Sequence, residues 1–372
     1  MNALGYLVAF LIPASVLPAL LFGGLWAFFT PMFVFFLVPL ADGLIGTDES
    51  NADESEEQRR AQNPLYRALT LLWVPVQFAV LGAALLQVGG GALTVAETIG
   101  LLLSVGIVGG TGINVAHELM HRKSKVDRAA AEILLSAVSY THFCVEHVHG
   151  HHKRVATPED PASARLGENL YAFIPRSIVG GMRSFWELET RIAGRQSVAG
   201  TWRDRRIRYP LVVALFIVAA LSLGGVAGVV FFALQSVVAM VMLEVINYVE
   251  HYGLERKRQG DRYERVRPQH SWNSGHLLTG RLLFGLPRHS DHHFLANRPY
   301  PILRHHESAP QLPAGYAAMF LVALVPPVWH RVMNPRVASV RANTVRANTV
   351  RANTVRANTV RGEAVGANTG HA

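Results

Sequence analysis

Long apolar stretches separated by shorter polar ones dominate the chain. The first 46 residues carry one charge, Asp42, and a Gly23-Gly24 pair interrupts them near the middle. A helix rises 1.5 Å per residue, so about 20 apolar residues cross the hydrocarbon core of a bilayer. This stretch predicts two membrane-spanning helices that meet at the glycine pair. It does not have the pattern of a secretory signal peptide, because no basic residues precede the apolar run and the run is too long.

Four further apolar segments follow in two pairs, at residues 65–88 and 95–116 and at residues 210–232 and 233–249. Glycines mark the turn or break of each pair: Gly89-Gly90-Gly91 in the first, and Gly224-Gly225 and Gly228 in the second. A backbone in lipid must satisfy its own hydrogen bonds, so the pattern predicts an all-α integral membrane protein with six transmembrane helices. Residues 312–333 are also apolar but contain Pro326-Pro327, and we interpret them as interfacial rather than as a seventh crossing.

The positive charge is unevenly distributed. The chain has 35 Lys and Arg against 26 Asp and Glu, and fifteen of the 35 lie between Glu118 and Arg208. The three predicted hairpin tips, near Gly23-Gly24, residues 89–93 and residues 221–230, contain none. By the positive-inside rule the basic segment and both termini face the cytoplasm of a cell inner membrane. No basic patch is interleaved with aromatic residues, so nucleic acid is not an expected partner.

The C-terminal 35 residues form a separate region. Arg341-Ala342-Asn343-Thr344-Val345 opens a five-residue motif that repeats four times. The repeat lacks the apolar residues that stacked units need to bury a core. We expect a membrane domain at residues 1–337 and a disordered low-complexity tail at residues 338–372.

Histidine is the candidate chemistry of the chain. All 17 histidines lie at or after His117. Nine of them concentrate at four places near the predicted cytoplasmic ends of crossings: His117 and His121; His147, His151 and His152; His251; and His289, His292 and His293. On a helix, residues three or four apart share a face, so His117/His121, His147/His151 and His289/His292/His293 can each chelate one ion. The side chain of His152 points about 100° away from that of His151 and could serve a neighbouring ion.

Nine imidazoles exceed the four ligands that one tetrahedral zinc accepts, so two ions is the natural stoichiometry. Nitrogen-rich sites with open positions suit iron, zinc, copper or nickel. The stretch from His117 to His121 also fits the His-Glu-x-x-His pattern of zinc proteases, with Glu118 as general base, but one zinc leaves the other clustered histidines unexplained. A divalent-metal transporter should line a path through the bilayer with polar residues, whereas here they gather at one face.

Several polar residues beside these histidines are candidates for supporting roles. Glu118, Glu146, Glu250 and Asp291 each neighbour a clustered histidine and could fix a ring tautomer, or instead pair with nearby Arg or Lys. Glu244, Asn247 and His251 share one face of the last crossing. Because a carboxylate is costly to place that deep in a membrane, Glu244 is a candidate functional residue. It could equally form a hydrogen bond with a polar group on a neighbouring helix.

The histidine clusters together resemble those of the membrane-bound alkane 1-monooxygenases, within the fatty acid desaturase and hydroxylase superfamily. The resemblance runs from about the second crossing to Pro335. It rests on the stretches His147–His152 with its continuation Val155–Arg165, Asn247–Gly253, Ser271–Ser274 and Arg288–His293. The chain departs from the usual sequence of this family at three places: Met120, Pro287 and residues 294–301. These differences do not affect the clustered histidines, but they leave the identity of the substrate open.

The resemblance implies a non-haem di-iron monooxygenase with nine iron ligands: His117, His121, His147, His151, His152, His251, His289, His292 and His293. It implies hydroxylation of the terminal methyl of an alkane by O2. Aromatic-methyl hydroxylation of the xylene type and fatty-acyl desaturation or hydroxylation remain alternatives. Further histidines that could support the ligands are His270 and His276, with His142 and His149 as weaker cases. The histidines at 305, 306, 330 and 371 are expected at the surface.

Electrons must come from another protein, because the single Cys144 cannot form an in-chain rubredoxin-type iron site. The resemblance implies rubredoxin and an NAD(P)H-dependent rubredoxin reductase, with membrane lipid as the surroundings. A basic surface is a possible dock for an acidic carrier: Arg203, Arg205, Arg206, Arg256, Lys257 and Arg258.

Overall fold

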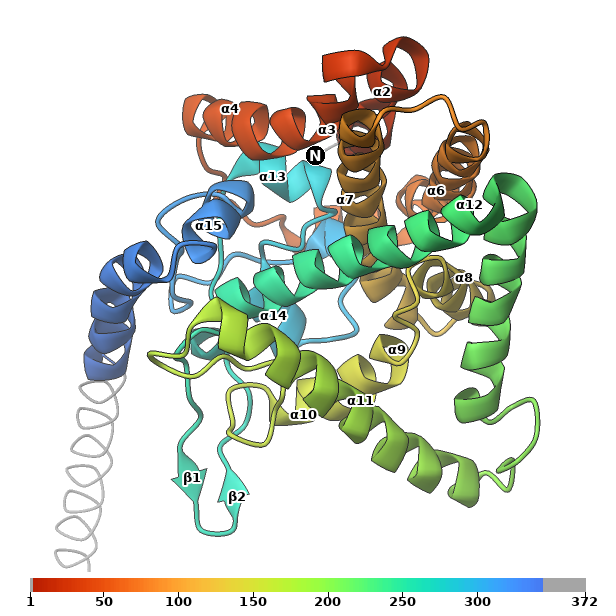
Figure 1. Cartoon of the computed structure of the whole chain (residues 1–372). Coiled ribbons are helices and arrows are strands. Elements are labelled where there is room, and N and C mark those ends of the chain that lie inside the picture. The colour runs from red at the N-terminus through yellow and green to blue at the C-terminus, as the bar shows by residue number, and fades with distance from the viewer. Residues whose placement is uncertain (1–2, 344–372) are drawn as a thin grey trace, which may run out of the picture.

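The computed structural model describes residues 3–343 and is built almost entirely of helices (Figure 1). In chain order its elements are η1 (Ala3–Phe10), α1 (Leu11–Ala14), α2 (Leu17–Phe22), η2 (Gly24–Phe28), α3 (Phe29–Met32), η3 (Phe33–Leu37), α4 (Val38–Ile45), α5 (Glu54–Gln62), α6 (Pro64–Gly89), α7 (Val95–Met120), α8 (Lys125–Ser136), α9 (Phe143–Glu146), η4 (His147–His151), α10 (His152–Arg154), α11 (Leu170–Arg195), α12 (Arg205–His251), β1 (Arg258–Gln259), β2 (Arg262–Tyr263), η5 (Pro268–His270), α13 (Leu277–Leu282), α14 (His289–Phe294), η6 (Tyr300–Ile302) and α15 (Tyr316–Ala323). A last helix, Pro326–Asn343, follows α15.

The predicted crossings are present. Helical segments long and apolar enough to span a membrane occupy Ala3–Phe22, Gly24–Ile45, Pro64–Gly89, Val95–Met120 and Arg205–His251. The last of these is α12, which is broken at Gly225 into two arms that run in different directions (Figure 1). Counting each arm as one crossing gives the six that the sequence predicts. The break lies at Gly225, so the second arm begins earlier than the predicted residue 233.

Glycines permit the sharp turns between crossings. Gly23 and Gly24 have φ of 59° and 55°, and Gly225 has φ of 61°. These left-handed conformations are open to glycine at little cost, whereas a residue with a Cβ resists them. The side chain of Glu97 fastens the first turn, because it accepts a hydrogen bond of 2.6 Å from the Gly24 amide while completing a capping box with Thr94.

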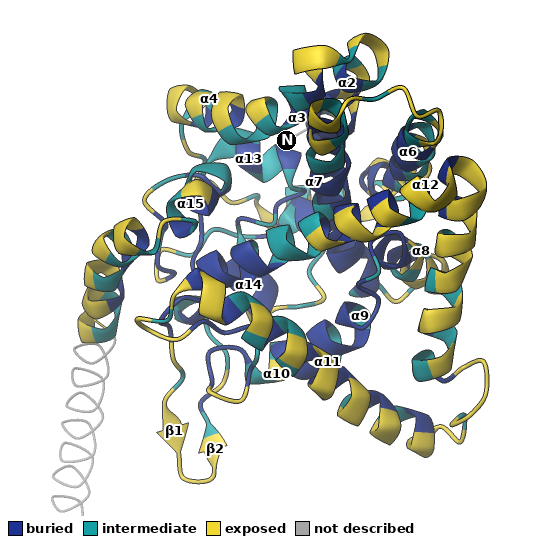
Figure 2. Ribbon diagram, in the orientation of Figure 1, coloured by how far each residue is buried: buried dark blue, intermediate teal, exposed yellow. Residues whose placement is uncertain are grey.

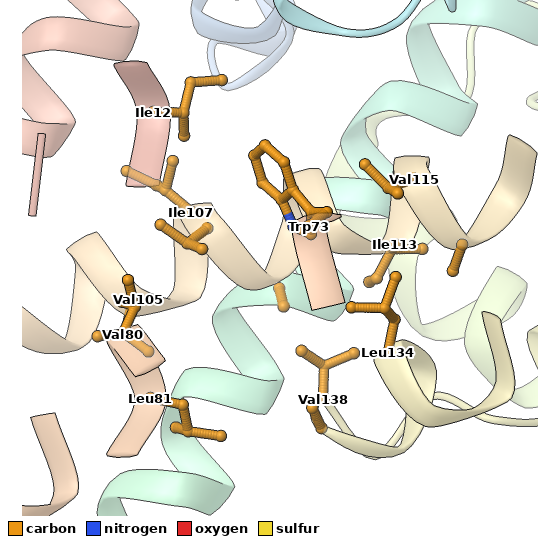
Figure 3. Packing of buried hydrophobic residues seen from close by; sticks show 14 of the residues in the cluster. Ile12, Trp73, Val80, Leu81, Val105, Ile107, Ile113, Val115, Leu134 and Val138 are labelled. Carbon is orange, nitrogen blue, oxygen red and sulfur yellow. The ribbon is translucent and has the colours of Figure 1, made fainter. Parts of the chain in front are cut away.

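Helix α7 is the centre of the molecule. It packs against α6, α8 and α12, and most of its residues are buried (Figure 2). Figure 3 shows the core around it, with side chains from α6 (Trp73, Val80, Leu81), α7 (Val105, Ile107, Ile113, Val115) and α8 (Leu134). In contrast, α12 exposes large apolar residues such as Leu215, Leu221 and Val226. An exposed apolar surface on helices of this length is what a lipid-facing surface requires.

The region that contains Pro326-Pro327 is broken there, as the sequence predicts. Helix α15 and the helix Pro326–Asn343 are bent by 120° relative to each other. Both pack on the end of α12 through a second core cluster that includes Tyr248, Tyr316 and Trp329. The predicted domain boundary at residue 337 falls inside the last helix, which continues to Asn343. The rest of the predicted tail lies outside the described residues.

Candidate metal centre

Five elements bring the nine clustered histidines together. His117 and His121 lie at the end of α7, His147 and His151 in η4, His152 in α10, His251 at the end of α12, and His289, His292 and His293 in α14. The segment Ser271–Ser274 holds two of these elements in place. The Trp272 amide donates to the Glu250 carbonyl (2.8 Å), and the Asn273 side chain accepts from the Ser290 amide (2.8 Å). The motif noted in the sequence thus ties the end of α12 to α14.

The histidines form two groups, each able to hold one ion. One contains His117, His121, His147, His152 and His292, and the other contains His151, His251, His289 and His293. Within each group the candidate ligand atoms all lie within 4.8 Å of one another. The structure therefore gathers the nine residues that the sequence singled out and divides them into two groups.

The spacing of the Nε2 atoms tests whether a metal fits. In the first group, His117–His292, His147–His152 and His152–His292 are 2.8, 2.9 and 3.0 Å apart. In the second group, His289–His293, His151–His293 and His251–His289 are 2.9, 3.2 and 3.2 Å apart. With metal–nitrogen bonds of about 2.1 Å, neighbouring ligands lie about 3.0 Å apart at a right angle and about 3.4 Å apart at a tetrahedral angle. Spacings of 2.8–3.2 Å are therefore those of nitrogen ligands that share one metal ion.

Hydrogen bonding alone does not satisfy these ring nitrogens. The Nε2 of His289 lies within 3.2 Å of the Nε2 atoms of His251 and His293 and of a carboxylate oxygen of Glu250. A ring nitrogen carries at most one hydrogen and can donate to only one of these three. The Nε2 of His121 is buried and has no hydrogen-bond partner within residues 3–343. A cation among the rings would satisfy all of these atoms together.

Burial keeps most of these rings neutral, which is the form that binds metal. It lowers the pKa of His121 to about 4. Burial likewise holds the pKa well below its ordinary value in five more clustered histidines: His147, His152, His289, His292 and His293. These six histidines present free nitrogen lone pairs at neutral pH.

The predicted pairing of histidines within the clusters is partly wrong. His117 and His121 share a group as expected, but His147 and His151 fall into different groups, and His152 joins His147. The reason is that residues His147–His151 form a π-helix, whose wider turn aligns residues five apart instead of four. In α14, His289 pairs with His293, and His292 points to the other group.

One supporting residue was missed from the sequence. Asp160 is buried, and its Oδ2 accepts a hydrogen bond of 2.9 Å from the Nδ1 of His151. A carboxylate in this position fixes the ring orientation and leaves Nε2 free for a metal. Burial acts to raise the pKa of Asp160, but the His151 ring and the Ser163 hydroxyl outweigh it and keep that pKa below its ordinary value. Asp160 lies in an irregular loop, where no helical spacing points to it.

Glu250 is the predicted acid that reaches the histidines. Its Oε2 lies 3.2 Å from the Nε2 of His289, and its Oε1 accepts a hydrogen bond of 2.9 Å from the Tyr316 hydroxyl. Both side chains are buried. Tyr316 was also missed, because it lies in the region interpreted as interfacial, far from the clusters in sequence.

The other predicted acids point elsewhere and pair with arginines. Glu118 accepts from Arg122 (2.8 Å), and Glu146 accepts from Arg154 (2.8 Å). Asp291 accepts from Arg298 (3.0 Å) and contacts His306. The salt-bridge alternative therefore describes these three residues. A Glu118 turned toward Arg122 is also poorly placed to act as the general base of a zinc protease.

Glu244, Asn247 and His270 lie outside both groups. Glu244 accepts from the Tyr140 hydroxyl (2.6 Å) and from the Asn247 amide (3.4 Å), so these residues bond to one another. They line a small polar cavity that also touches His147 and His151. His270 is buried, lies 3.4 Å from Glu264 and accepts from the Arg267 amide, so its contacts are within its own loop. The weaker candidates His142, His149 and His276 are likewise absent from both groups.

An apolar cavity adjoins the metal centre. It has a free volume of about 90 Å³ and is lined mainly by aliphatic and aromatic side chains, among them Ile12, Phe35, Met242, Leu286 and Phe320. Tyr316 also lines the cavity, so its hydrogen bond to Glu250 connects the cavity wall to the second histidine group.

A buried polyhistidine centre at the end of an apolar helical bundle defines a membrane-bound metalloprotein. Residues 92–323 match the family model of the fatty acid desaturases. The chain is 43% identical to alkane 1-monooxygenase 2 of Pseudomonas aeruginosa over 326 residues (84% of this chain, 85% of the relative) and 42% identical to alkane 1-monooxygenase 2 of Alcanivorax borkumensis over 354 residues (91% and 92%). It is 27% identical to the hydroxylase component of the xylene/toluene monooxygenase of Pseudomonas putida over 337 residues (88% and 87%). The chain belongs to the fatty acid desaturase family and, within it, to the alkane 1-monooxygenases.

Proposed function

We propose that this protein is a membrane-bound non-haem di-iron monooxygenase that hydroxylates the terminal methyl group of an alkane to a primary alcohol. One oxygen atom of O2 enters the C–H bond and the other leaves as water, with two electrons from a carrier protein and two protons from solvent. The observation that carries the proposal is the link from the apolar cavity through Tyr316 and Glu250 to His289 of the second histidine group.

The residues suit two iron ions. His117, His121, His147, His152 and His292 would hold one ion, and His151, His251, His289 and His293 the other. Bound iron would supply the activation of O2 that no amino acid side chain provides. Asp160 orients the His151 ring, and the Glu250 carboxylate adds an oxygen donor beside the group of four. The cavity holds the substrate against this centre and excludes water from it.

The cavity favours an uncharged substrate. Its lining contains no Lys, Arg or His. Its polar side chains direct their donors elsewhere: Asn114 to the Leu283 carbonyl (2.8 Å), Thr111 to the Ile107 carbonyl (3.1 Å) and Thr279 to Asp42. A fatty-acyl substrate would bring a polar or charged head group that finds no partner here. An alkane needs none, and burial contributes about 0.8 kcal/mol per CH2 group.

An aromatic-methyl substrate is the competing proposal, because a relative is named for xylene and toluene. The two substrates differ in shape. Only the linear alkane gains further binding energy with each added carbon. A series of chain lengths therefore separates the two substrate classes.

We propose that the electron carrier is a rubredoxin served by an NAD(P)H-dependent reductase, and that it docks on the β1–β2 hairpin. Lys257, Arg258 and Arg262 are exposed there. At the base of the hairpin, Arg256 donates to the carbonyl of Lys153 (2.7 Å), the residue after His152. Of the other predicted docking residues, Arg203 is also exposed, whereas Arg205 pairs with Glu189 (3.0 Å) and Arg206 with Asp204 (2.6 Å).

The same charge distribution supports an inner-membrane location with the metal centre toward the cytoplasm. Arg122, Arg154, Arg288 and Arg298 lie near the histidine-bearing ends of the helices, whereas the tip between α6 and α7 carries no Lys or Arg. Positively charged ends of membrane helices remain on the cytoplasmic side.

The test combines metal content with product. The purified chain, reconstituted with iron, is supplied with O2, NADH, a rubredoxin and its reductase, and offered octane, hexadecane, xylene and a palmitoyl substrate. We expect about two irons per chain and a 1-alkanol as the main product. One zinc per chain without an oxygen-dependent product would refute the proposal. Faster turnover of xylene than of either alkane would reassign the substrate, and an alkene or hydroxylated acyl product would place the enzyme with the desaturases.

A further inference from the structure

A second pocket, separate from the metal centre, is lined by basic side chains. It lies between η1, α5, α13, η6 and the segment before α14, has a free volume of about 40 Å³ and is partly open to solvent. Three arginines line it, Arg60, Arg281 and Arg288, against one carboxylate, Asp48. Figure 1 shows α13 beside the N-terminal elements, at a distance from the β1–β2 hairpin.

Two of the three arginines in this pocket form no ion pair within residues 3–343. Arg288 donates to the backbone carbonyls of Leu303 (2.7 Å), Ser50 (2.9 Å) and Asp48 (3.1 Å) rather than to a carboxylate. Arg60 pairs with Glu56. Arg281 forms neither an ion pair nor a side-chain hydrogen bond within residues 3–343, and its Nε is buried. Leaving a buried guanidinium nitrogen without an acceptor is costly.

Further donors face the same space. Tyr6 packs its ring against Phe284 and Tyr300, but its hydroxyl has no hydrogen-bond partner in the described part of the chain. Asp48 accepts from the amide and hydroxyl of Ser50 through Oδ1 (2.9 and 2.6 Å), and its single negative charge faces three arginines. The pocket thus combines free N–H and O–H donors with an excess of positive charge, which is the chemistry that recognises an oxyanion.

The position of the pocket indicates the source of that anion. Tyr6 belongs to the start of the first crossing, and Arg60 belongs to the polar helix that follows the second crossing. The pocket therefore lies at the boundary between the apolar bundle and the polar end of the molecule. Basic pockets between membrane helices at this depth bind phospholipid head groups.

We propose that Tyr6, Arg60, Arg281 and Arg288 form a binding site for the phosphate of an anionic phospholipid. The site does not depend on the proposed enzymatic function. Because Arg288 directly precedes His289, a bound lipid fastens the start of α14 and so stabilises the folded protein.

The test measures lipid retention and thermal stability of the full chain in a neutral detergent. Phosphatidylglycerol with eight-carbon chains is titrated against wild type, against Arg281→Gln, and against the matched control Arg59→Gln, which removes an exposed arginine on α5 outside the pocket. We expect saturable binding of one lipid with a rise in Tm, about tenfold weaker binding to Arg281→Gln, and no change for Arg59→Gln. Tyr6→Phe, which keeps the packed ring, should weaken binding by a smaller factor.

Two further titrants distinguish the sources of the anion. Phosphatidylcholine, whose phosphate is balanced by its choline, should raise Tm less than phosphatidylglycerol does. Inorganic phosphate that binds as tightly as the lipid would overturn the assignment to a phospholipid. Unchanged phosphatidylglycerol binding by both Arg281→Gln and Tyr6→Phe would overturn the site itself. If Arg281→Gln does not fold, the site is tested by comparing phosphatidylglycerol binding of Tyr6→Phe with that of wild type.

Discussion

The contact between Asp160 and His151 makes a sharp prediction about metal affinity. Asp160 Oδ2 accepts from His151 Nδ1 at 2.9 Å and from the Ser163 hydroxyl at 2.6 Å, and Oδ1 accepts from the Ala162 amide at 3.3 Å. Every neighbour of the carboxylate is therefore a donor. Asp160→Asn keeps the size of the side chain but turns an N–H₂ group toward at least one of these donors. The His151 ring then loses its fixed orientation.

The size of the effect follows from the burial of this pair. Both side chains are almost completely buried. A hydrogen bond to a charged group in such a place is worth about 1.5–3 kcal/mol. Loss of a partner that orients a metal-binding histidine costs about 10- to 100-fold in metal affinity, or about 1.4–2.8 kcal/mol. The two ranges agree, so we expect one of the two metal sites to bind about 10- to 100-fold more weakly in Asp160→Asn.

The assay is an anaerobic titration of the metal-free protein with ferrous iron, read as iron per chain after competition with a chelator. Wild type should retain its iron at chelator concentrations that remove iron from Asp160→Asn. Glu187→Gln is the control, because it removes an exposed carboxylate that pairs with Arg191 at the surface. If both Asp160→Asn and Asp160→Ala retain two ions as tightly as wild type, then Asp160 does not orient a ligand and the reasoning is refuted.

Three more predictions follow from the site and the fold. Tyr316→Phe removes the hydroxyl that holds Glu250. We expect at least a tenfold fall in alcohol formed per NADH consumed, while the iron content stays at the wild-type level. An unchanged product yield would contradict this prediction. His152→Ala should lower the iron content, whereas His149→Ala, which lies three residues away but outside both groups, should not; equal iron contents would disprove the assignment. Gly225→Ala adds a Cβ to a residue with φ of 61°, and no atom lies within 4 Å of that Cβ. The substitution should therefore lower the free energy of unfolding by about 1–3 kcal/mol through backbone strain alone. A Tm equal to that of the wild type would show that the break in α12 does not need glycine.

The nine clustered histidines could be found from sequence because their signal is local. Helical spacing places His117 with His121 before any tertiary structure is known, and recurrence at several helix ends makes a shared site the simplest explanation. The same rule failed at His147 and His151, because it assumes the α-helical turn. A π-helix shifts the alignment by one residue, and the sequence gives no direct sign of it.

The supporting acids show a different limit. Glu118 and Asp291 are next to ligands in sequence, yet neighbours on a helix point about 100° apart, so an acid beside an inward-facing histidine faces outward. That geometry explains why both pair with arginines. Glu250 reaches a histidine of another helix instead, and Asp160 arrives from a loop. Contacts between elements depend on packing that no single helix encodes.

The two histidine groups are interleaved along the chain. The segment His147–His152 supplies ligands to both groups, and so does α14. Neither ion can be seated without ordering backbone that also carries ligands for the other. Binding of the first ion therefore includes the conformational-entropy cost of ordering both segments, whereas the second ion binds to histidine rings that are already ordered. The two ions should load cooperatively, so that a protein starved of iron contains fully loaded and empty molecules rather than a population that holds one ion each.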